Sequence, residues 1–274
     1  MAAGPQLAPS PDPFYRELRE VIAHPADDGA RLQYAERCGG ARADFIRSQV
    51  RLASLPNGLD HPDAPWLAAH SDELLAASGA EWAPAWYRDA GIRVIGYDRG
   101  FIECVGGAGS GLDDSSMQRN LIQSAPLRHL DIEAPCTAEE IGRILDSTLG
   151  QQIVSLSLDD TGVDSNAIQA LVSSKAAKNL RWLSLERNGL SLEAIQLLAR
   201  LPELLYVYLS ANQAHPVERF YEDNGVVVET WMPPEGLELE RIFGPLRWLH
   251  PPTVDGRQIG IDRMAVGRHA FTAS

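Results

Sequence analysis

The chain is poor in cysteine, and the cysteines it has are scattered. Its 274 residues include three, Cys38, Cys104 and Cys136, and none of them stands in CxxC spacing. An odd, scattered set is typical of reduced thiols and argues against a disulfide framework or a zinc site. The seven histidines do not pair at metal-ligand spacing either. We therefore expect no metal and no cofactor.

Basic residues are also few. The chain has 24 Lys and Arg against 37 Asp and Glu, which gives a formal net charge of −13. Binding to nucleic acid or to an anionic membrane depends on Lys and Arg, so we expect neither partner. An acidic surface favours solubility and can attract a basic protein.

Long apolar runs and targeting signals are missing as well. No stretch approaches the roughly 18 apolar residues of a membrane-spanning helix. Residues 1–9 contain neither the basic nor the apolar segment of a secretory signal peptide. We expect a cytoplasmic protein.

Catalytic motifs are absent too. The sequence has no Gly-x-Ser-x-Gly and no His-Glu-x-x-His, the patterns that carry a nucleophile or a metal base in large enzyme classes. Gly-x-Gly spacing in residues 106–111 lacks the lysine of a phosphate loop, and we interpret this stretch as a flexible connector. The sequence therefore favours a protein that is not an enzyme.

One apolar pattern, LxxLxL, recurs in the middle of the chain. Its copies occupy residues 127–132, 153–158, 180–185 and 204–209. The spacing of about 24–27 residues is that of a leucine-rich repeat, in which a short strand is followed by a returning helix. A single unit cannot bury its own apolar strip, so neighbouring units stack and share a core.

Polar residues recur at matching positions around these strands. Thr161, Asn188 and Asn212 follow each core leucine or valine at the same offset, where a leucine-rich repeat bonds neighbouring backbone turns. Thr137 with Glu140 has the capping-box pattern, and Ser191 is a second N-cap. The outer helices resemble the ribonuclease-inhibitor-like subclass of leucine-rich repeats.

Helical periodicity dominates the N-terminal part, and a hairpin follows it. Apolar residues at helical spacing predict helices over residues 12–23, 30–37, 42–53 and 64–78, and we expect Leu32 and Tyr34 to lie inside. Alternating residues over 92–97 and 101–105, separated by Asp98-Arg-Gly100, predict a hairpin.

The same N-terminal region resembles a known module. The segments His24-Pro-Ala-Asp-Asp28, Arg31-Leu-Gln-Tyr-Ala35 and Arg42-Ala-Asp-Phe-Ile-Arg47-Ser-Gln49 resemble the bacterial repeat-companion domain. That domain precedes leucine-rich or similar repeats in bacterial proteins. His24 and residues 36–38 depart from the family pattern. The resemblance implies a helical module and no catalytic activity.

These patterns together predict an α/β fold. We expect a short leucine-rich-repeat solenoid, preceded by an N-terminal helical module and closed by a C-terminal cap. The expected segments are a disordered arm (1–12), the repeat-companion module (13–80), a hairpin and N-terminal cap (81–126), the repeats (127–214), and the C-terminal cap and tail (215–274).

The strand residues that point away from the core form the candidate binding site. They stack in two columns, with a third column of acids, Glu133, Asp159 and Glu186, at the strand ends. Exposed aromatic residues on such a face are typical binding anchors. An alternative is that the C-terminal cap covers the two tyrosines. The predicted protein-binding residues are His129, Asp131, Ser155, Ser157, Trp182, Ser184, Tyr206 and Tyr208.

Three functions fit this sequence. The first is a protein-interaction scaffold, a monomer or weak oligomer, that binds a partner of basic character through the strand face. The second is an immunity or inhibitor protein that neutralises a toxin enzyme. The third is an enzyme with a carboxylate site in the N-terminal module, around Asp27, Asp28, Arg31 and Tyr34.

Overall fold

The computed structural model describes two compact units. It covers residues 13–56, 58–201, 203–209, 212, 220–223, 226–229, 241, 253–254 and 257–258. The described residues of Met1–Gly106 and Arg119–Leu127 form the N-terminal unit, and those of Gly107–Gln118 and Arg128–Asp262 form the C-terminal unit. Each unit is described by itself below.

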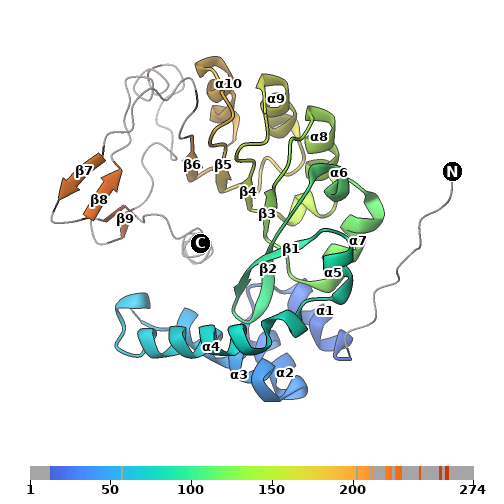
Figure 1. The fold of residues 1–274 in the computed structure, drawn as a ribbon, viewed down its shortest axis with the longest axis vertical. Coiled ribbons are helices and arrows are strands. Elements are labelled where there is room, and N and C mark those ends of the chain that lie inside the picture. The colour runs from blue at the N-terminus through green and yellow to red at the C-terminus, as the bar shows by residue number, and fades with distance from the viewer. Residues whose placement is uncertain are drawn as a thin grey trace. The chain divides into compact units, whose positions relative to one another are not determined.

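Helices make up most of the N-terminal unit (Figure 1). They are α1 (Tyr15–Ala23), α2 (Asp28–Cys38), α3 (Gly40–Ala53), the 3₁₀ turn η1 (Gly58–Asp60), α4 (Ala64–Trp82) and the short α5 (Ala85–Asp89). The predicted helices are confirmed, and α4 continues to Trp82. Tyr34 is buried as expected, whereas the expectation that Leu32 lies inside is wrong, because this residue is 37% exposed.

The core of this unit joins α1, α2 and α3 to the following hairpin. Buried apolar side chains from the three helices pack together with Phe101, which is 2% exposed. A second, smaller core lies at the other end of α3 and contains Leu52, Ala64 and Leu67. Nonpolar burial of this kind is the main force that holds the helices together.

The predicted hairpin is present and its turn needs glycine. Strand β1 (Arg93–Asp98) pairs antiparallel with β2 (Phe101–Gly107). Arg99 and Gly100 have positive φ angles of 45° and 87°, which suits a tight hairpin turn. A Cβ atom on Gly100 would lie 2.6 Å from the Cα atom of Ile46 in α3. The turn therefore sits directly on the backbone of α3.

The glycine-rich stretch after β2 is folded, so the expectation of a flexible connector is wrong. Gly107 still belongs to β2, and α6 (Gly109–Leu112) begins two residues later. Gly109 is buried, and a Cβ atom there would lie 2.5 Å from the Cys136 sulfur. Gly109 therefore serves close packing in the C-terminal unit. Helix α7 (Ser115–Ser124) follows.

Parallel strands form the sheet of the C-terminal unit. They are β3 (His129–Ile132), β4 (Ser155–Ser157), β5 (Trp182–Ser184) and β6 (Tyr206–Tyr208), and neighbours pair in sequence order. The register aligns Leu130, Leu156, Leu183 and Val207, the recurring apolar residues of the sequence. The chain is thus mixed α/β.

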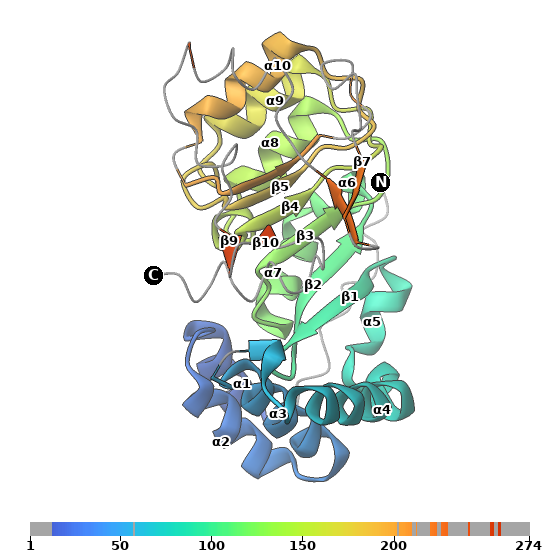
Figure 2. The same ribbon diagram turned by 90° about the vertical axis from the view of Figure 1, so that its left-hand side faces the viewer.

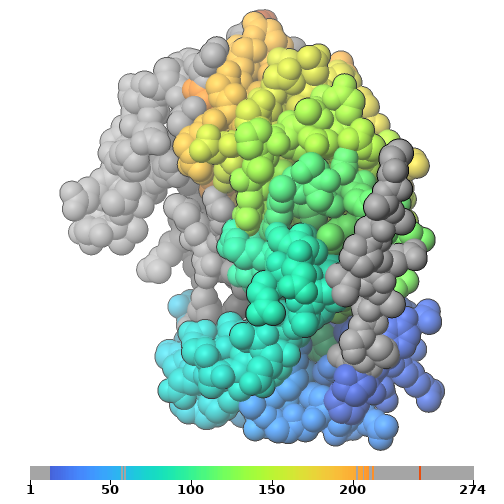
Figure 3. Space-filling view, turned by 45° about the vertical axis from the view of Figure 1, so that its right-hand side comes forward, coloured from blue at the N-terminus to red at the C-terminus, as the bar shows by residue number. Residues whose placement is uncertain are grey.

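Helices return between the strands and lie in a row on one side of them (Figures 1 and 2). They are α8 (Ala138–Asp146), α9 (Ser165–Ser173) and α10 (Leu192–Gln196), with the 3₁₀ turns η2 (Gly150–Gln152) and η3 (Leu197–Arg200). Their outer surfaces adjoin one another in the green to orange part of Figure 3. The capping box of Thr137 and Glu140 and the N-cap of Ser191 are confirmed.

Side-chain amides connect the turns that follow the strands. Asn188 Oδ1 accepts bonds from the backbone nitrogens of Thr161 and Val163, both at 3.1 Å, and its Nδ2 donates to the carbonyl of Leu158. Asn212 repeats this arrangement one turn later, toward the backbone around Asn188. The predicted role is confirmed for Asn188 and Asn212, whereas the Thr161 hydroxyl donates within its own turn, to the carbonyl of Leu158.

Beyond the parallel strands, the described elements are short. Strand β7 (Phe220–Asp223) pairs antiparallel with β8 (Val226–Glu229), and β9 (Thr253–Val254) pairs with β10 (Arg257–Gln258). The predicted arm (1–12) and most of the predicted C-terminal cap (215–274) lie outside the described residues.

The Asn188 contacts predict a large effect of one substitution. Asn188→Ala leaves backbone groups of two turns without partners, and each such group costs about 1–3 kcal/mol. We expect the free energy of unfolding to fall by about 2–4 kcal/mol in urea denaturation. Asn166→Ala is the control, because this exposed side chain bonds only to Asp164. Equal stability of the two variants would contradict the structural role of Asn188.

Candidate functional site

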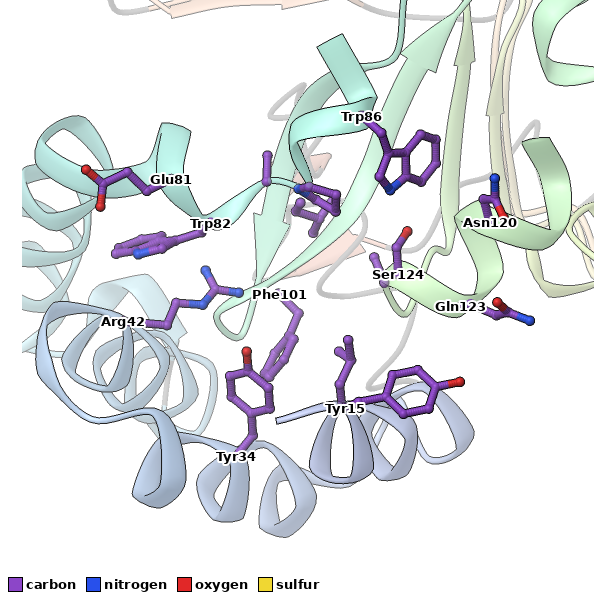
Figure 4. Close-up of a pocket in the computed structure, with 15 residues that line it drawn as sticks. Tyr15, Tyr34, Arg42, Glu81, Trp82, Trp86, Phe101, Asn120, Gln123 and Ser124 are labelled. Carbon is purple, nitrogen blue, oxygen red and sulfur yellow. The ribbon is translucent and has the colours of Figure 1, made fainter. Parts of the chain in front are cut away.

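A cavity of about 340 Å³ lies within the N-terminal unit. Helices α1, α2, α3, α4 and α7, the residues before and in α5, and strand β2 supply its walls (Figure 4). All of its lining residues belong to the N-terminal unit. The lining residues labelled in Figure 4 are Tyr15, Tyr34, Arg42, Glu81, Trp82, Trp86, Phe101, Asn120, Gln123 and Ser124.

Aromatic rings form the main wall of the cavity. The rings of Tyr34 and Phe101 meet edge to face with centroids 5.0 Å apart, a favoured aromatic geometry. Trp82 packs against Phe45 at 4.9 Å, and Phe45 in turn contacts Tyr97 at 5.5 Å. Each of these rings packs against another ring, which restricts its orientation.

A cation lies over these rings. The guanidinium carbon of Arg42 is 4.8 Å from the centroid of Trp82 and 5.4 Å from that of Phe101. It also lies 5.6 Å from the ring of Tyr97. The pKa of Tyr97 is raised because the phenol is buried, and the positive charge of Arg42 opposes that rise. The guanidinium of Arg42 therefore already covers one face of these rings with a positive charge.

The opposite wall is polar and comes from α7. The Ser124 hydroxyl donates to the carbonyl of Leu121 at 2.9 Å, and it lies 2.8 Å from the hydroxyl of Tyr87. Burial raises the pKa of Tyr87 well above its usual range. Tyr87 is therefore a protonated phenol that donates to Ser124, and this bond holds α7 beside α5.

Trp86 has an unsatisfied donor next to this wall. Its Nε1 atom is buried and has no hydrogen-bond partner among the described residues. Figure 4 shows the indole nitrogen turned toward the middle of the lining residues, on the same side as Ser124. An indole nitrogen can only donate. The cavity thus combines aromatic faces, one unpaired donor and the amides of Asn120 and Gln123.

The strand face predicted from the sequence is more buried than expected. Trp182, Ser157 and Ser184 are exposed by 6%, 5% and 1%, so the expectation that they form an exposed surface is wrong. The ring of Trp182 packs against Tyr208 at 5.4 Å between centroids. Ser184 donates to the carboxylate of Asp159.

Other residues of that face are partly accessible. His129, Asp131, Ser155 and Tyr208 are half-buried, and Glu133 is exposed. The register brings His129 beside Ser155 and Asp131 beside Ser157. The side chain of Tyr206 lies outside the described part of the chain.

The acidic residues of the N-terminal module have structural partners. Asp27 caps α2 by accepting from the Gly29 nitrogen at 2.8 Å, and Asp28 pairs with Arg99 at 3.0 Å. Arg31 is fully buried and pairs with Glu103. Of the four residues in the enzyme hypothesis, only Tyr34 lines the aromatic cavity.

Sequence reasoning missed the cavity because its walls come from distant segments. Tyr15 and Ala125 stand at the two ends of the set, and no fixed spacing links them. One local signal was available, namely the aromatic run Trp82, Trp86 and Tyr87 around Pro84. Such a cluster within six residues is unusual outside a core or a binding site.

Comparisons with protein-family models, with curated proteins and with solved structures found no match to this chain. No helix in the described ranges is long and apolar enough to cross a membrane. Among the residues that the structure describes, no group of three or more His, Cys, Asp or Glu side chains is placed to hold a metal ion.

Glu103 gives the N-terminal unit a predicted pH dependence. Burial, helped by Asp98, raises the pKa of Glu103 to about 7, and Arg31 opposes the rise. A raised pKa means that this group favours folding below its unfolded pKa of about 4.3, and that the contribution is lost as pH rises through 7. As pH rises from 5 to 8, we expect the difference in stability between Glu103→Gln and wild type to shift in favour of the variant by about 1–3 kcal/mol, because only wild type loses this contribution.

Glu140→Gln is the matched control with the opposite sign. Bonds from Thr137 hold the pKa of Glu140 below its usual value, so its contribution is lost as pH falls. Urea denaturation of both variants across pH 3–8 measures the two trends. Parallel pH profiles for wild type and Glu103→Gln would show that Glu103 does not titrate in this range.

Proposed function

We propose that the chain is a non-enzymatic scaffold that binds a partner protein. In this proposal the parallel strands and returning helices of the C-terminal unit are a short leucine-rich-repeat solenoid of the ribonuclease-inhibitor-like kind. The helices α1 to α4 are a repeat-companion module. Support comes from the strand register, from the helices on one side of the strands, and from the asparagine contacts between turns.

The observation that carries the binding proposal is the acidic character of the accessible strand face. Asp131 points away from the core on β3, and Glu133 follows it at the strand end. Carboxylates gathered at one edge of a strand face attract a basic surface and set the rate of encounter.

The burial of three predicted residues reduces the part of the strand face that a partner can contact. Trp182, Ser157 and Ser184 support the face from within, and contact with a partner falls to His129, Asp131, Ser155 and Tyr208. Tyr208 supplies the aromatic contact, with its ring held by Trp182 at 5.4 Å. A ring fixed in this way loses little entropy on binding.

We place the protein in the cytoplasm, where its thiols stay reduced.

Charge reversal tests the proposal. The bait proteins are wild type, Asp131→Lys and the control Glu139→Lys, which makes the same charge change on the exposed start of α8. We expect quantitative affinity capture from the source cell to recover one basic protein with wild type and Glu139→Lys, and at least tenfold less of it with Asp131→Lys. Recovery should fall as salt rises.

Two results would contradict the proposal. One is equal recovery on all three baits, which would place the contact away from the strand face. The other is the absence of any protein above the level of an empty matrix. Urea denaturation of each bait shows whether a loss of capture reflects the surface or the fold.

A further inference from the structure

The aromatic cavity of the N-terminal unit has the size of a small-molecule site. Its volume of about 340 Å³ falls in the range of ligand pockets, which is roughly 300–1,000 Å³. Ligand pockets typically have apolar walls with a few convergent polar groups. Trp82, Trp86 and Phe101 provide the apolar walls here, and Asn120 and Ser124 the polar side.

The unpaired indole of Trp86 defines what the ligand must offer. A buried donor without an acceptor costs stability, and a ligand that accepts from it recovers that loss. The Nε1 atom is buried, faces the lining residues, and has no partner within the described part of the chain (Figure 4). A ligand for this site therefore carries a hydrogen-bond acceptor.

The aromatic rings define the rest of the ligand. Ring faces favour a planar partner that stacks or meets them edge to face. Arg42 already lies over Trp82 and Phe101 at 4.8 and 5.4 Å, so a second cation is repelled from these faces. Glu81 is exposed and also lines the cavity, and its carboxylate offsets the positive charge of Arg42 toward an anion. A neutral ring satisfies both constraints.

We propose that this cavity binds small, neutral, planar aromatic molecules, such as aromatic amides, whose carbonyl oxygen accepts from Trp86 Nε1. The ring occupies the space between Trp82, Trp86 and Phe101. The amide group of the ligand meets Asn120 and Ser124 on α7. This site lies in the other unit from the strand face, so it stands independently of protein binding.

A matched pair of probes and a matched pair of variants test the site. Benzamide carries the ring and the carbonyl, whereas toluene carries the ring alone. Trp86→Phe removes the donor and keeps an aromatic ring. Trp66→Phe is the control, because Trp66 is 62% exposed on α4 and does not line the cavity. Ligand-observed NMR titration measures the dissociation constants on the full chain.

The expected result is a specific coupling between the donor and the carbonyl. Benzamide should bind wild type with a dissociation constant of about 1 mM, as suits a ligand of its size. Trp86→Phe should raise the dissociation constant of benzamide about three- to tenfold, which corresponds to the loss of one hydrogen bond. The same substitution should change the dissociation constant of toluene by less than about twofold. Trp66→Phe should leave the dissociation constants of both probes unchanged. Benzylammonium should not bind.

Three outcomes would overturn the proposal. They are no binding of benzamide to wild type, an equal effect of Trp86→Phe on benzamide and toluene, and binding of benzylammonium as tight as that of benzamide. One measurement needs no variant. In uniformly ¹⁵N-labelled wild type, one of the six indole N–H protons should move downfield with benzamide and not with toluene. No such shift would also overturn the assignment of Trp86.

Discussion

The buried guanidinium of Arg31 is the interaction on which the N-terminal unit depends. A fully buried charge is tolerated only when its partners are in place. Arg31 donates to the carbonyls of Pro25 at 2.6 Å and Asp98 at 3.0 Å, and it pairs with Glu103. It thus joins the loop before α2, the hairpin turn and strand β2. The cavity depends on this junction, because Tyr34 lies one helical turn after Arg31.

The C-terminal unit is held together by a different principle. Its strands β4, β5 and β6 have three residues each, too few to be stable alone. Stability comes from neighbours that share apolar layers, and from Asn188 and Asn212, which connect consecutive turns. Its stability is therefore distributed along the chain.

The sequence predicted those features that repeat locally. Leu130, Leu156 and Leu183 identified the strands, since a period of about 24–27 residues needs no tertiary information. The same reasoning failed for Trp182, because alternation tells which side of a strand a residue occupies and not what packs over it. The prediction for Leu32 was wrong in the opposite direction, because a residue expected inside is exposed. The cavity was beyond prediction, since Arg42 and Trp86 line one cavity only through the packing of separate helices.

The boundary between the units crosses helix α7. Ser115–Gln118 belong to the C-terminal unit, and the rest of the helix belongs to the N-terminal unit. The N-terminal unit is therefore discontinuous in sequence. During synthesis, the chain from Met1 to Gly106 leaves the ribosome without Asn120 and Ser124, which complete the cavity wall. The lining of the cavity is therefore complete only after α7 has been synthesised, when the first residues of the C-terminal unit, from Gly107 onward, have already been made.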